Sequence, residues 1–352
     1  MHGTHRKTCL LVFPDDWISY SPTVLNLLSL LNVRGIETNV ITFEADHQVN
    51  ELPGRSAAIR IHRRVKQALT RYNMYSTYKL RRLIGRLRKE PRYDHYVGVD
   101  SVGALALQLA GIKSFDFLSL EVQRDGFFQR IDRSLIRYAV IQSIERYSYL
   151  FPSDGPTYFL IQNSPIMDSD AAPRTLHGQP KLVFLGNAIP SHGILECIAF
   201  IAATPDLTLE VCGLVPPNIA QCISSSPAAD RIKVRTDYVS QADIRRYLAS
   251  FDIGVCLYNV ENSDFNYQSV PSGKLFNYFS VGLPVVATNL PGLRSVRDFA
   301  AGVLIESNSA PNIGRAVAQI RRDYWSCSNG AARAGNHFSF DRMAKPYVDS
   351  LL

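Results

Sequence analysis

The 352-residue sequence lacks several features that would restrict its chemistry at once. No apolar run approaches the roughly 18 residues of a membrane-spanning helix, and the apolar run after the basic start, Thr8–Phe13, is too short for a signal peptide. The six cysteines lie far apart, without a CxxC pair or a histidine at ligand spacing. We therefore expect reduced core thiols in a cytoplasmic protein, and neither disulfides nor a zinc site.

Glycine-rich and paired acidic ligand motifs are also scarce. The first turn, PDDWISYSP at 14–22, contains no Gly-x-Gly-x-x-Gly loop, so a dinucleotide at this turn gains little support. The adjacent pair Asp15 and Asp16 lies in this N-terminal half, away from the phosphate-type turn described below. We therefore expect no metal and no cofactor. Asp15 and Asp16 are expected to be exposed loop carboxylates, with contact to a substrate as the alternative.

Hydrophobic residues make up 46% of the chain and charged residues 20%, which is typical of a globular protein long enough for two domains. Short apolar strands alternate with helical stretches, which predicts α/β domains with parallel sheets. In domain 1–164 the expected strands are Thr8–Phe13, Thr38–Phe43, Tyr93–Val99, Lys113–Leu120, Tyr138–Ile141 and Thr157–Ile161. In domain 181–339 they are Leu182–Leu185, Leu207–Cys212, Ile232–Arg235, Ile253–Leu257, Val285–Ala287 and Val303–Ile305. Residues 165–180, with three prolines and no apolar period, predict a linker.

Basic residues concentrate in one segment. Residues 60–92 hold twelve Lys or Arg against one acid, Glu90, so this segment carries +11 and the rest of the chain −4. Apolar residues recur there at helical spacing, which predicts one or two amphipathic helices with a polybasic face. Such helices bind anionic membranes; a solvated face or, more weakly, a nucleic-acid patch are the alternatives. The residues expected to face a membrane are Arg63, Arg64, Lys66, Arg81, Arg82, Arg86, Arg88 and Lys89.

The stretch from Ser269 to Val296 has the order turn, helix, strand, turn. Ser272 and Gly273 form a small-residue turn, Lys274 follows, and a helical run begins at Leu275. Free amide N–H groups at a helix start, beside a lysine, suit a phosphate. An ordinary α/β crossover with a surface lysine is the alternative.

Two further candidates follow strands, where ligands gather in parallel sheets. Glu121 follows the strand that ends at Leu120. It could contact a ligand or occupy an ordinary surface position, and the sequence favours neither. His192 lies in the turn Gly186–Gly193 and could face a diphosphate, or simply begin a helix.

The run PSGKLFNYFSVGLPVVATNLPGLRSV at 271–296 resembles the donor-binding region of retaining GT-B glycosyltransferases of the family-four, "group 1" type. The resemblance continues in KLVFLGNAIPSHGILECI, ASFDIGVCLY and YFLIQNSP. It implies two Rossmann-like domains facing a cleft, a UDP- or GDP-linked sugar in the C-terminal domain, an acceptor on the side of Asp15 and Asp16, and no metal. The last helix, Phe340–Leu352, looks like the one that crosses back to the N-terminal domain.

The resemblance also implies roles for single residues. The donor-binding set is Gly186, Asn187, Gly193, Tyr258, Ser272, Gly273, Lys274, Asn277, Asn289 and Gly292. Lys274 and His192 would act on the phosphates, and Glu121 would contact the reaction centre. The family's paired glutamates fall on Ser269 and Asn277, and its usual Arg and Lys on Asn187 and His192. Neutral hydrogen bonds from Asn277 to the ribose would weaken the donor about tenfold relative to a carboxylate.

These observations predict a retaining glycosyltransferase that works at the inner face of the membrane, as a peripheral protein, on a lipid-linked or glycan acceptor. No nucleic-acid partner is expected. The alternative is a catalytically degenerate GT-B protein that serves as a membrane-recruited partner subunit, which the asparagines at 187 and 277 favour.

Overall fold

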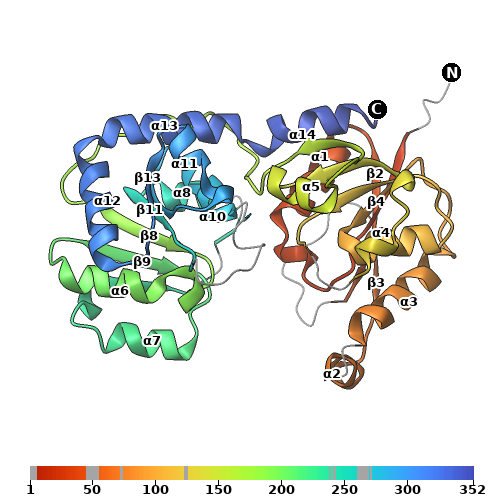
Figure 1. Ribbon diagram of the computed structural model, residues 1–352, viewed down its shortest axis with the longest axis horizontal. Coiled ribbons are helices and arrows are strands. Elements are labelled where there is room, and N and C mark those ends of the chain that lie inside the picture. The colour runs from red at the N-terminus through yellow and green to blue at the C-terminus, as the bar shows by residue number, and fades with distance from the viewer. Residues whose placement is uncertain are drawn as a thin grey trace. The chain divides into compact units, whose positions relative to one another are not determined.

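The computed structural model describes residues 6–44, 55–71, 74–122, 126–237, 239–240, 243–259, 269 and 272–352, with the side chains of Arg55 and Arg63 also left out. The chain divides into two compact units, Met1–Ile161 with Phe340–Leu352, and Gln162–Ser339. Each unit contains one sheet whose described pairings are all parallel, flanked by helices (Figure 1). The predicted class, two Rossmann-like α/β domains, is confirmed.

The N-terminal unit contains a seven-stranded sheet in the order β3-β2-β1-β4-β5-β6-β7. Its strands are β1 (Thr8–Val12), β2 (Glu37–Phe43), β3 (Arg55–Ile59), β4 (His95–Val99), β5 (Phe115–Ser119), β6 (Ile136–Ile141) and β7 (Thr157–Leu160). Its helices are α1 (Pro22–Val33), α2 (Arg63–Arg71), α3 (Tyr75–Leu87), α4 (Asp100–Leu109), α5 (Ile144–Leu150) and α14 (Phe340–Asp349). The chain reverses its direction of travel across the sheet between β1 and β4, so their carboxyl ends form the place where doubly wound sheets bind ligands.

Six of these strands were predicted, and β3 was not. β3 has the sequence RSAAI and pairs only with β2, at the edge of the sheet. Its one large apolar residue, Ile59, is buried. An edge strand of this composition has neither the continuous apolar run nor the alternation that marks a strand in a sequence.

The C-terminal unit contains a six-stranded sheet in the order β10-β9-β8-β11-β12-β13. Its strands are β8 (Lys181–Leu185), β9 (Thr208–Cys212), β10 (Ile232–Arg235), β11 (Ile253–Cys256), β12 (Val285–Thr288) and β13 (Gly302–Ile305). Its helices are α6 (Ile194–Ala203), α7 (Pro217–Ser224), α8 (Ile244–Leu248), α10 (Gly273–Phe279), α11 (Ser295–Asp298), α12 (Ala310–Arg322) and α13 (Tyr324–His337). Alternate strand residues enter two cores: Phe184 packs with α6 and α12, whereas Val183 packs with α8, α10 and α11.

The predicted linker is held against the C-terminal unit. Residues 162–180 contain no helix or strand, but Arg174 donates to the carbonyls of Phe251 and Ala249, both at 2.7 Å. The amide of Ala171 donates to Asn336 Oδ1 at 2.7 Å. The amide of Arg174 likewise donates to Ser328 Oγ at 2.7 Å, so side chains of the C-terminal unit satisfy linker amides that have no ladder partners.

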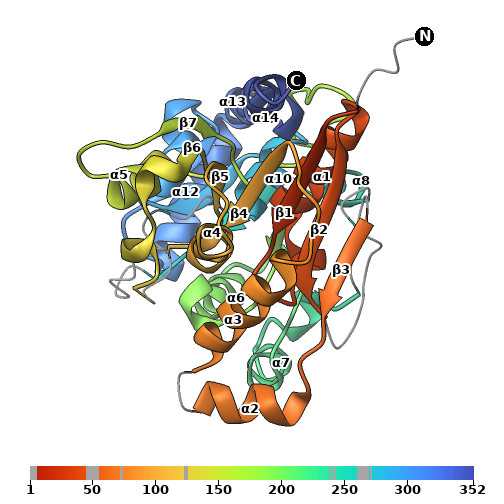
Figure 2. The same ribbon diagram turned by 90° about the vertical axis from the view of Figure 1, so that its right-hand side faces the viewer.

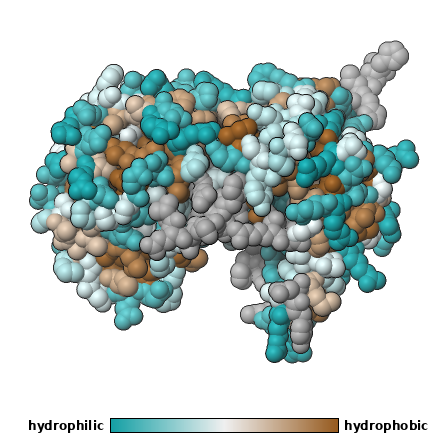
Figure 3. Space-filling model, in the orientation of Figure 1, coloured by the Kyte–Doolittle hydropathy of each residue, from teal (hydrophilic) through white to brown (hydrophobic). Residues whose placement is uncertain are grey.

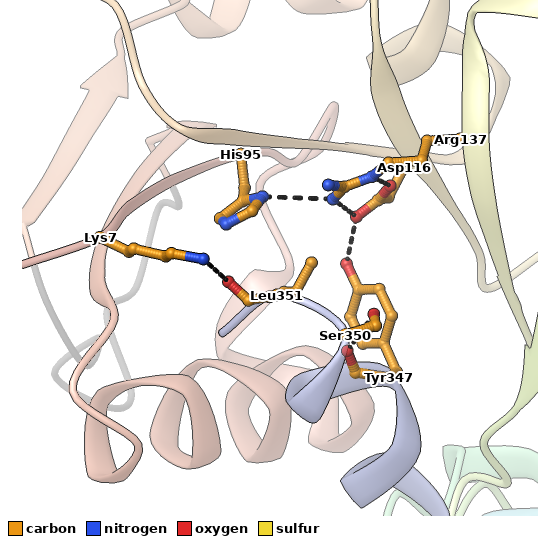
Figure 4. Close-up of polar contacts among 7 residues, drawn as sticks. All are labelled: Lys7, His95, Asp116, Arg137, Tyr347, Ser350 and Leu351. Carbon is orange, nitrogen blue, oxygen red and sulfur yellow. Dashed lines mark hydrogen bonds and ion pairs between the residues drawn. The ribbon is translucent and has the colours of Figure 1, made fainter.

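The last helix completes the N-terminal unit, as the resemblance implied (Figure 4). Phe340, Tyr347 and Val348 of α14 are fully buried in the core of that unit. Tyr347 Oη donates to Asp116 Oδ2 at 2.9 Å, and Arg137 binds both oxygens of this buried carboxylate at 2.9 and 2.8 Å. The helix is therefore fixed by a charged network as well as by apolar packing.

We expect Tyr347→Phe to lower the free energy of unfolding by about 1.5 to 3 kcal/mol, because it removes a hydrogen bond to a buried charge. Tyr20→Phe, at a tyrosine that is 53% exposed, is the matched control and should change it by less than about 0.5 kcal/mol. Denaturant unfolding at pH 7 measures both values, and equal effects of the two variants would contradict the role given to this network.

Candidate active site

The first part of the site is the turn after β8. Gly186 and Gly193 both have positive φ angles, 94° and 71°. A Cβ on Gly193 would lie 2.6 Å from Leu257 Cβ, so glycine is required where α6 begins. β8 pairs with β9 on one side and β11 on the other, so this turn lies at the strand-order reversal of the sheet. The sequence-predicted turn is therefore located where a ligand is expected.

Lys274 is the central residue of the site. Its Nζ atom is buried and has no hydrogen-bond partner in the described part of the chain. Nζ lies 4.5 Å from the ring centroid of Tyr258 and 4.9 Å from that of Phe184. Burial lowers the pKa of this ammonium. The alternative of a surface lysine is wrong, because the Lys274 amino group is buried beside two rings.

Asn277 lies one helical turn beyond Lys274. Its Oδ1 atom is also buried and also lacks a hydrogen-bond partner among the described residues. Positions i and i+3 lie on the same face of α10. Buried polar atoms are nearly always bonded, so two unsatisfied atoms on one helix face indicate that a ligand completes them.

His192 contacts the same side chains. Its ring packs edge-on against Tyr258 with centroids 5.1 Å apart, and Nδ1 lies 2.8 Å from the carbonyl oxygen of Asn187. Burial first, and then the charge of Lys274, lower the pKa of His192 to about 4. The imidazole is therefore neutral at pH 7, and Nδ1 carries the proton that Asn187 accepts. Of the two side chains predicted to meet phosphates, only Lys274 can be charged in the ligand-free protein.

The small-residue turn before α10 is tied to its surroundings. The hydroxyls of Ser272 and Tyr258 lie 2.9 Å apart, and Ser272 does not cap the helix with its side chain. A Cβ on Gly273 would lie 2.9 Å from Asn163 Nδ2, so this asparagine packs on the helix start. Asn163 belongs to the run YFLIQNSP, but its side chain had not been singled out. Pro271 lies outside the described residues.

The remaining donor-side predictions lie after β12. Asn289 is exposed and its Nδ2 donates to Glu306 Oε1 at 2.6 Å. Gly292 lies within the short turn Pro291–Leu293. Both follow a strand adjacent to β11, at the same edge as the turn after β8.

Asp15 and Asp16 differ from their expected exposed positions. Asp15 Oδ1 pairs with Lys79 Nζ at 2.5 Å, and Asp16 pairs with Lys66. Burial raises the pKa of Asp15 and Lys79 opposes that rise. The basic helices α2 and α3 thus neutralise this loop, which removes Lys66 from the charges available to a membrane.

Glu121 is accompanied by a residue that the sequence reading missed, Asp100. Glu121 lies 3.7 Å from the buried guanidinium of Arg146. Asp100 Oδ1 accepts the amides of Leu120 and Glu121 at 2.8 and 3.0 Å, and so fixes the loop that carries Glu121. Asp100 is 1% exposed, has a strained φ of 51°, and burial raises its pKa to about 7. The sequence does contain a signal for Asp100, because this acid directly follows the apolar strand HYVGV, which pairs with β1 where the strand order reverses.

Asp100→Asn tests this carboxyl. The ordinary pKa of 3.8 rises to about 7 on folding, so the native state binds the proton more tightly and wild-type stability falls as pH rises through this range. Asparagine keeps the acceptor oxygen and tolerates positive φ. We expect Asp100→Asn to raise the free energy of unfolding by at least about 1 kcal/mol at pH 8 and to leave it nearly unchanged at pH 4. Parallel pH profiles of the two proteins in denaturant unfolding would contradict the raised pKa.

Lys274→Met tests the buried ammonium without leaving a cavity. Because folding lowers the pKa of Lys274, its charge destabilises the ligand-free protein, and methionine should raise the free energy of unfolding by about 1 kcal/mol at pH 7. The gain should shrink as the pH approaches 10.5, where the unfolded lysine also loses its proton. Lys233→Met, at an exposed lysine, is the control. A lower free energy of unfolding in Lys274→Met than in the wild type would contradict the claim that the buried charge destabilises the ligand-free protein.

Known proteins share both the C-terminal sequence pattern and the fold. Residues 179–323 match the family model of group 1 glycosyltransferases. No curated protein matches the chain. Sucrose-phosphate synthase from Thermosynechococcus elongatus is 14% identical, with a TM-score of 0.68 and 98% of each chain covered. WaaG, a glycosyltransferase involved in lipopolysaccharide biosynthesis, is 12% identical, with a TM-score of 0.69 and 97% and 99% covered. Anabaena HepE, solved with UDP and glucose, is 12% identical, with a TM-score of 0.71 and 98% and 99% covered.

The structural neighbours establish the fold, which is GT-B. The family match falls on the unit that contains Lys274, Asn277 and His192. The C-terminal unit therefore matches group 1 glycosyltransferases in sequence and the chain matches GT-B glycosyltransferases in fold, so the resemblance seen in the sequence is confirmed.

Proposed function

We propose that this glycosyltransferase is a retaining enzyme that transfers a sugar from a UDP- or GDP-linked donor to a lipid-linked or glycan acceptor at the inner face of the membrane. The observation that carries the proposal is the buried ammonium of Lys274, which has no hydrogen-bond partner among the described residues. HepE has also been solved with UDP-glucose, and WaaG is involved in lipopolysaccharide biosynthesis. The HepE complex supports a nucleotide-sugar donor, and the role of WaaG supports a glycan-type acceptor.

Lys274 would pair with the donor diphosphate. Charge grows on this leaving group as the glycosidic bond breaks, and a cation in a dry, preorganised position stabilises the transition state more than the ground state. Burial is the larger cause of the low pKa of His192, and a bound anion would offset only the smaller cause, the charge of Lys274. The imidazole ring would therefore line the diphosphate site in its neutral form. Asn277 Oδ1, which has no hydrogen-bond partner among the described residues, would accept a hydrogen bond from a ribose hydroxyl.

The acceptor half of the reaction would need no protein nucleophile. In the retaining mechanism implied by the family, a donor phosphate oxygen takes the acceptor proton. Glu121, held by Arg146 and by the Asp100 cap, would then orient the acceptor near the reaction centre. Positive charge comes from Lys274, so the proposal requires neither metal nor cofactor.

The basic helices would supply the membrane contact. The amphipathic helices predicted from the sequence are α2 and α3, in which Leu80, Leu83 and Leu87 are buried while Arg81 and Arg82 are exposed. At α2, Figure 3 shows mainly hydrophilic side chains on the face in view. In the described ranges, no helix is long and apolar enough to cross a membrane. Peripheral contact through these cations is therefore the proposed mode.

A catalytically degenerate partner subunit is the second candidate, and Asn277 in place of the family's glutamate favours it. The two candidates differ in donor turnover. A subunit without activity would neither hydrolyse the donor nor depend on Lys274.

A panel of UDP, GDP and their sugars tests the proposal by thermal shift and calorimetry. A ligand at 100 times its Kd stabilises the protein by about 2.7 kcal/mol. We expect this shift in the wild type and not in Lys274→Met, and a fall in kcat of about 10² to 10³ in Lys274→Ala. Asn277→Glu should tighten the nucleotide about tenfold if Asn277 faces the ribose.

The control for this panel is again Lys233→Met, which should bind and turn over like the wild type. Wild-type turnover in Lys274→Ala would place the phosphates elsewhere. Binding of a nucleotide sugar without any transfer or hydrolysis would favour the partner-subunit candidate.

A further inference from the structure

A basic groove lies between the end of β3 and helix α3, elements that Figure 2 labels. Its volume is about 590 Å³. The polar side chains that line it are Arg60, Tyr78, Arg81, Arg82, Arg86 and Lys89. Ala58 and Ile59 of β3 contribute an apolar side. The groove belongs to the N-terminal unit and is separate from the residues placed at the donor.

Two of the five groove cations are neutralised within the protein. Arg60 binds Glu44 with both Nε and Nη2, at 2.6 and 2.9 Å, and Arg86 Nη2 lies 2.6 Å from Glu90. In the described part of the chain, no acidic partner pairs with Arg81, Arg82 or Lys89, and Arg82 donates to the hydroxyl of Tyr78 at 3.0 Å. Three positive charges therefore line one concave surface without an acidic partner in the described ranges.

Gly85 gives a second, independent observation. It lies inside α3 and lines the groove, although glycine is a poor residue for a helix interior. A Cβ built on Gly85 would meet no atom within 4 Å, so no neighbouring side chain requires glycine. The missing side chain keeps the middle of the groove open beside the unpaired cations.

We propose that this groove binds a phosphomonoester or diphosphate group, carried by a lipid headgroup or by a soluble molecule. Arginine forks bind phosphate oxygens bidentately, and a group with two or more negative charges matches the three uncompensated cations. This proposal rests on the proposed function in one respect, which is the anionic membrane as partner. It assigns membrane binding to one groove, whereas the proposed function assigns it to the basic helices as a whole. Arg64, Arg71 and Arg88 lie on or next to the same helices but do not line the groove.

The decisive comparison uses two variants that remove equal charge. Arg82→Gln with Lys89→Gln changes the groove, and Arg64→Gln with Arg88→Gln changes the surroundings. Vesicles that contain phosphatidic acid, or phosphatidylglycerol at matched surface potential, are used for flotation. We expect the wild type to prefer phosphatidic acid, the groove variant to lose at least tenfold in affinity, and the outer variant less than twofold. Equal losses in the two variants would show a diffuse field and overturn the proposal.

Two further measurements separate the source of the phosphate from a folding defect. Gly85→Leu should fill the groove and abolish the preference while unfolding at the same denaturant concentration as the wild type or higher, because leucine favours the helix. Pyrophosphate is titrated by calorimetry into Lys274→Met, so that the donor site does not contribute. Binding of pyrophosphate without a vesicle preference would identify a soluble ligand, and absence of both would refute the site. We expect the groove variant to bind UDP, GDP and their sugars like the wild type. A failure of the groove proposal can therefore be told apart from a failure of the proposed donor site.

Discussion

The C-terminal unit depends on one unfavourable feature, the buried ammonium of Lys274. This charge is removed from water and has no hydrogen-bond partner in the ranges that the structure describes, which destabilises the protein, and contacts with the rings of Tyr258 and Phe184 offset only part of that effect. Burial first, and then the charge of this ammonium, lower the pKa of His192 and keep its ring neutral. An anion bound beside this ammonium would therefore stabilise the unit.

The N-terminal unit solves the opposite problem, because acidic groups gather at the carboxyl ends of its strands. Each has its own form of compensation: Lys79 for Asp15, Arg146 for Glu121, and protonation together with two backbone amides for Asp100. Because burial raises the pKa of Asp100, this carboxyl adds less negative charge at these strand ends than an ordinary aspartate would. Its hydrogen bonds to two amides still fix the loop of Glu121.

Much of this could be predicted from local sequence, for physical reasons. Buried parallel strands such as β8 and β11 are continuous apolar runs, and the order turn, helix, strand around Lys274 is written in consecutive residues. The burial of Lys274 could not be predicted, because Phe184 is ninety positions away in the chain and only the β8–β11 pairing brings it close. The same holds for Asp100, whose pKa depends first on its burial and then on the amides of Leu120 and Glu121, which follow β5.

Lys274 is buried and the cations of the groove are not, so the range and the salt dependence of their electrostatic attraction differ, although both sites would bind phosphate. Salt screens exposed charges beyond about 8 Å at physiological ionic strength but affects buried pairs far less. Arg81, Arg82 and Lys89 are exposed, so their attraction would act at a distance, would bring the protein to an anionic surface and would weaken as salt rises. The ammonium of Lys274 acts only at contact, where water has been excluded. Exposed cations thus suit reversible recruitment, and a buried one suits the stabilisation of a departing diphosphate.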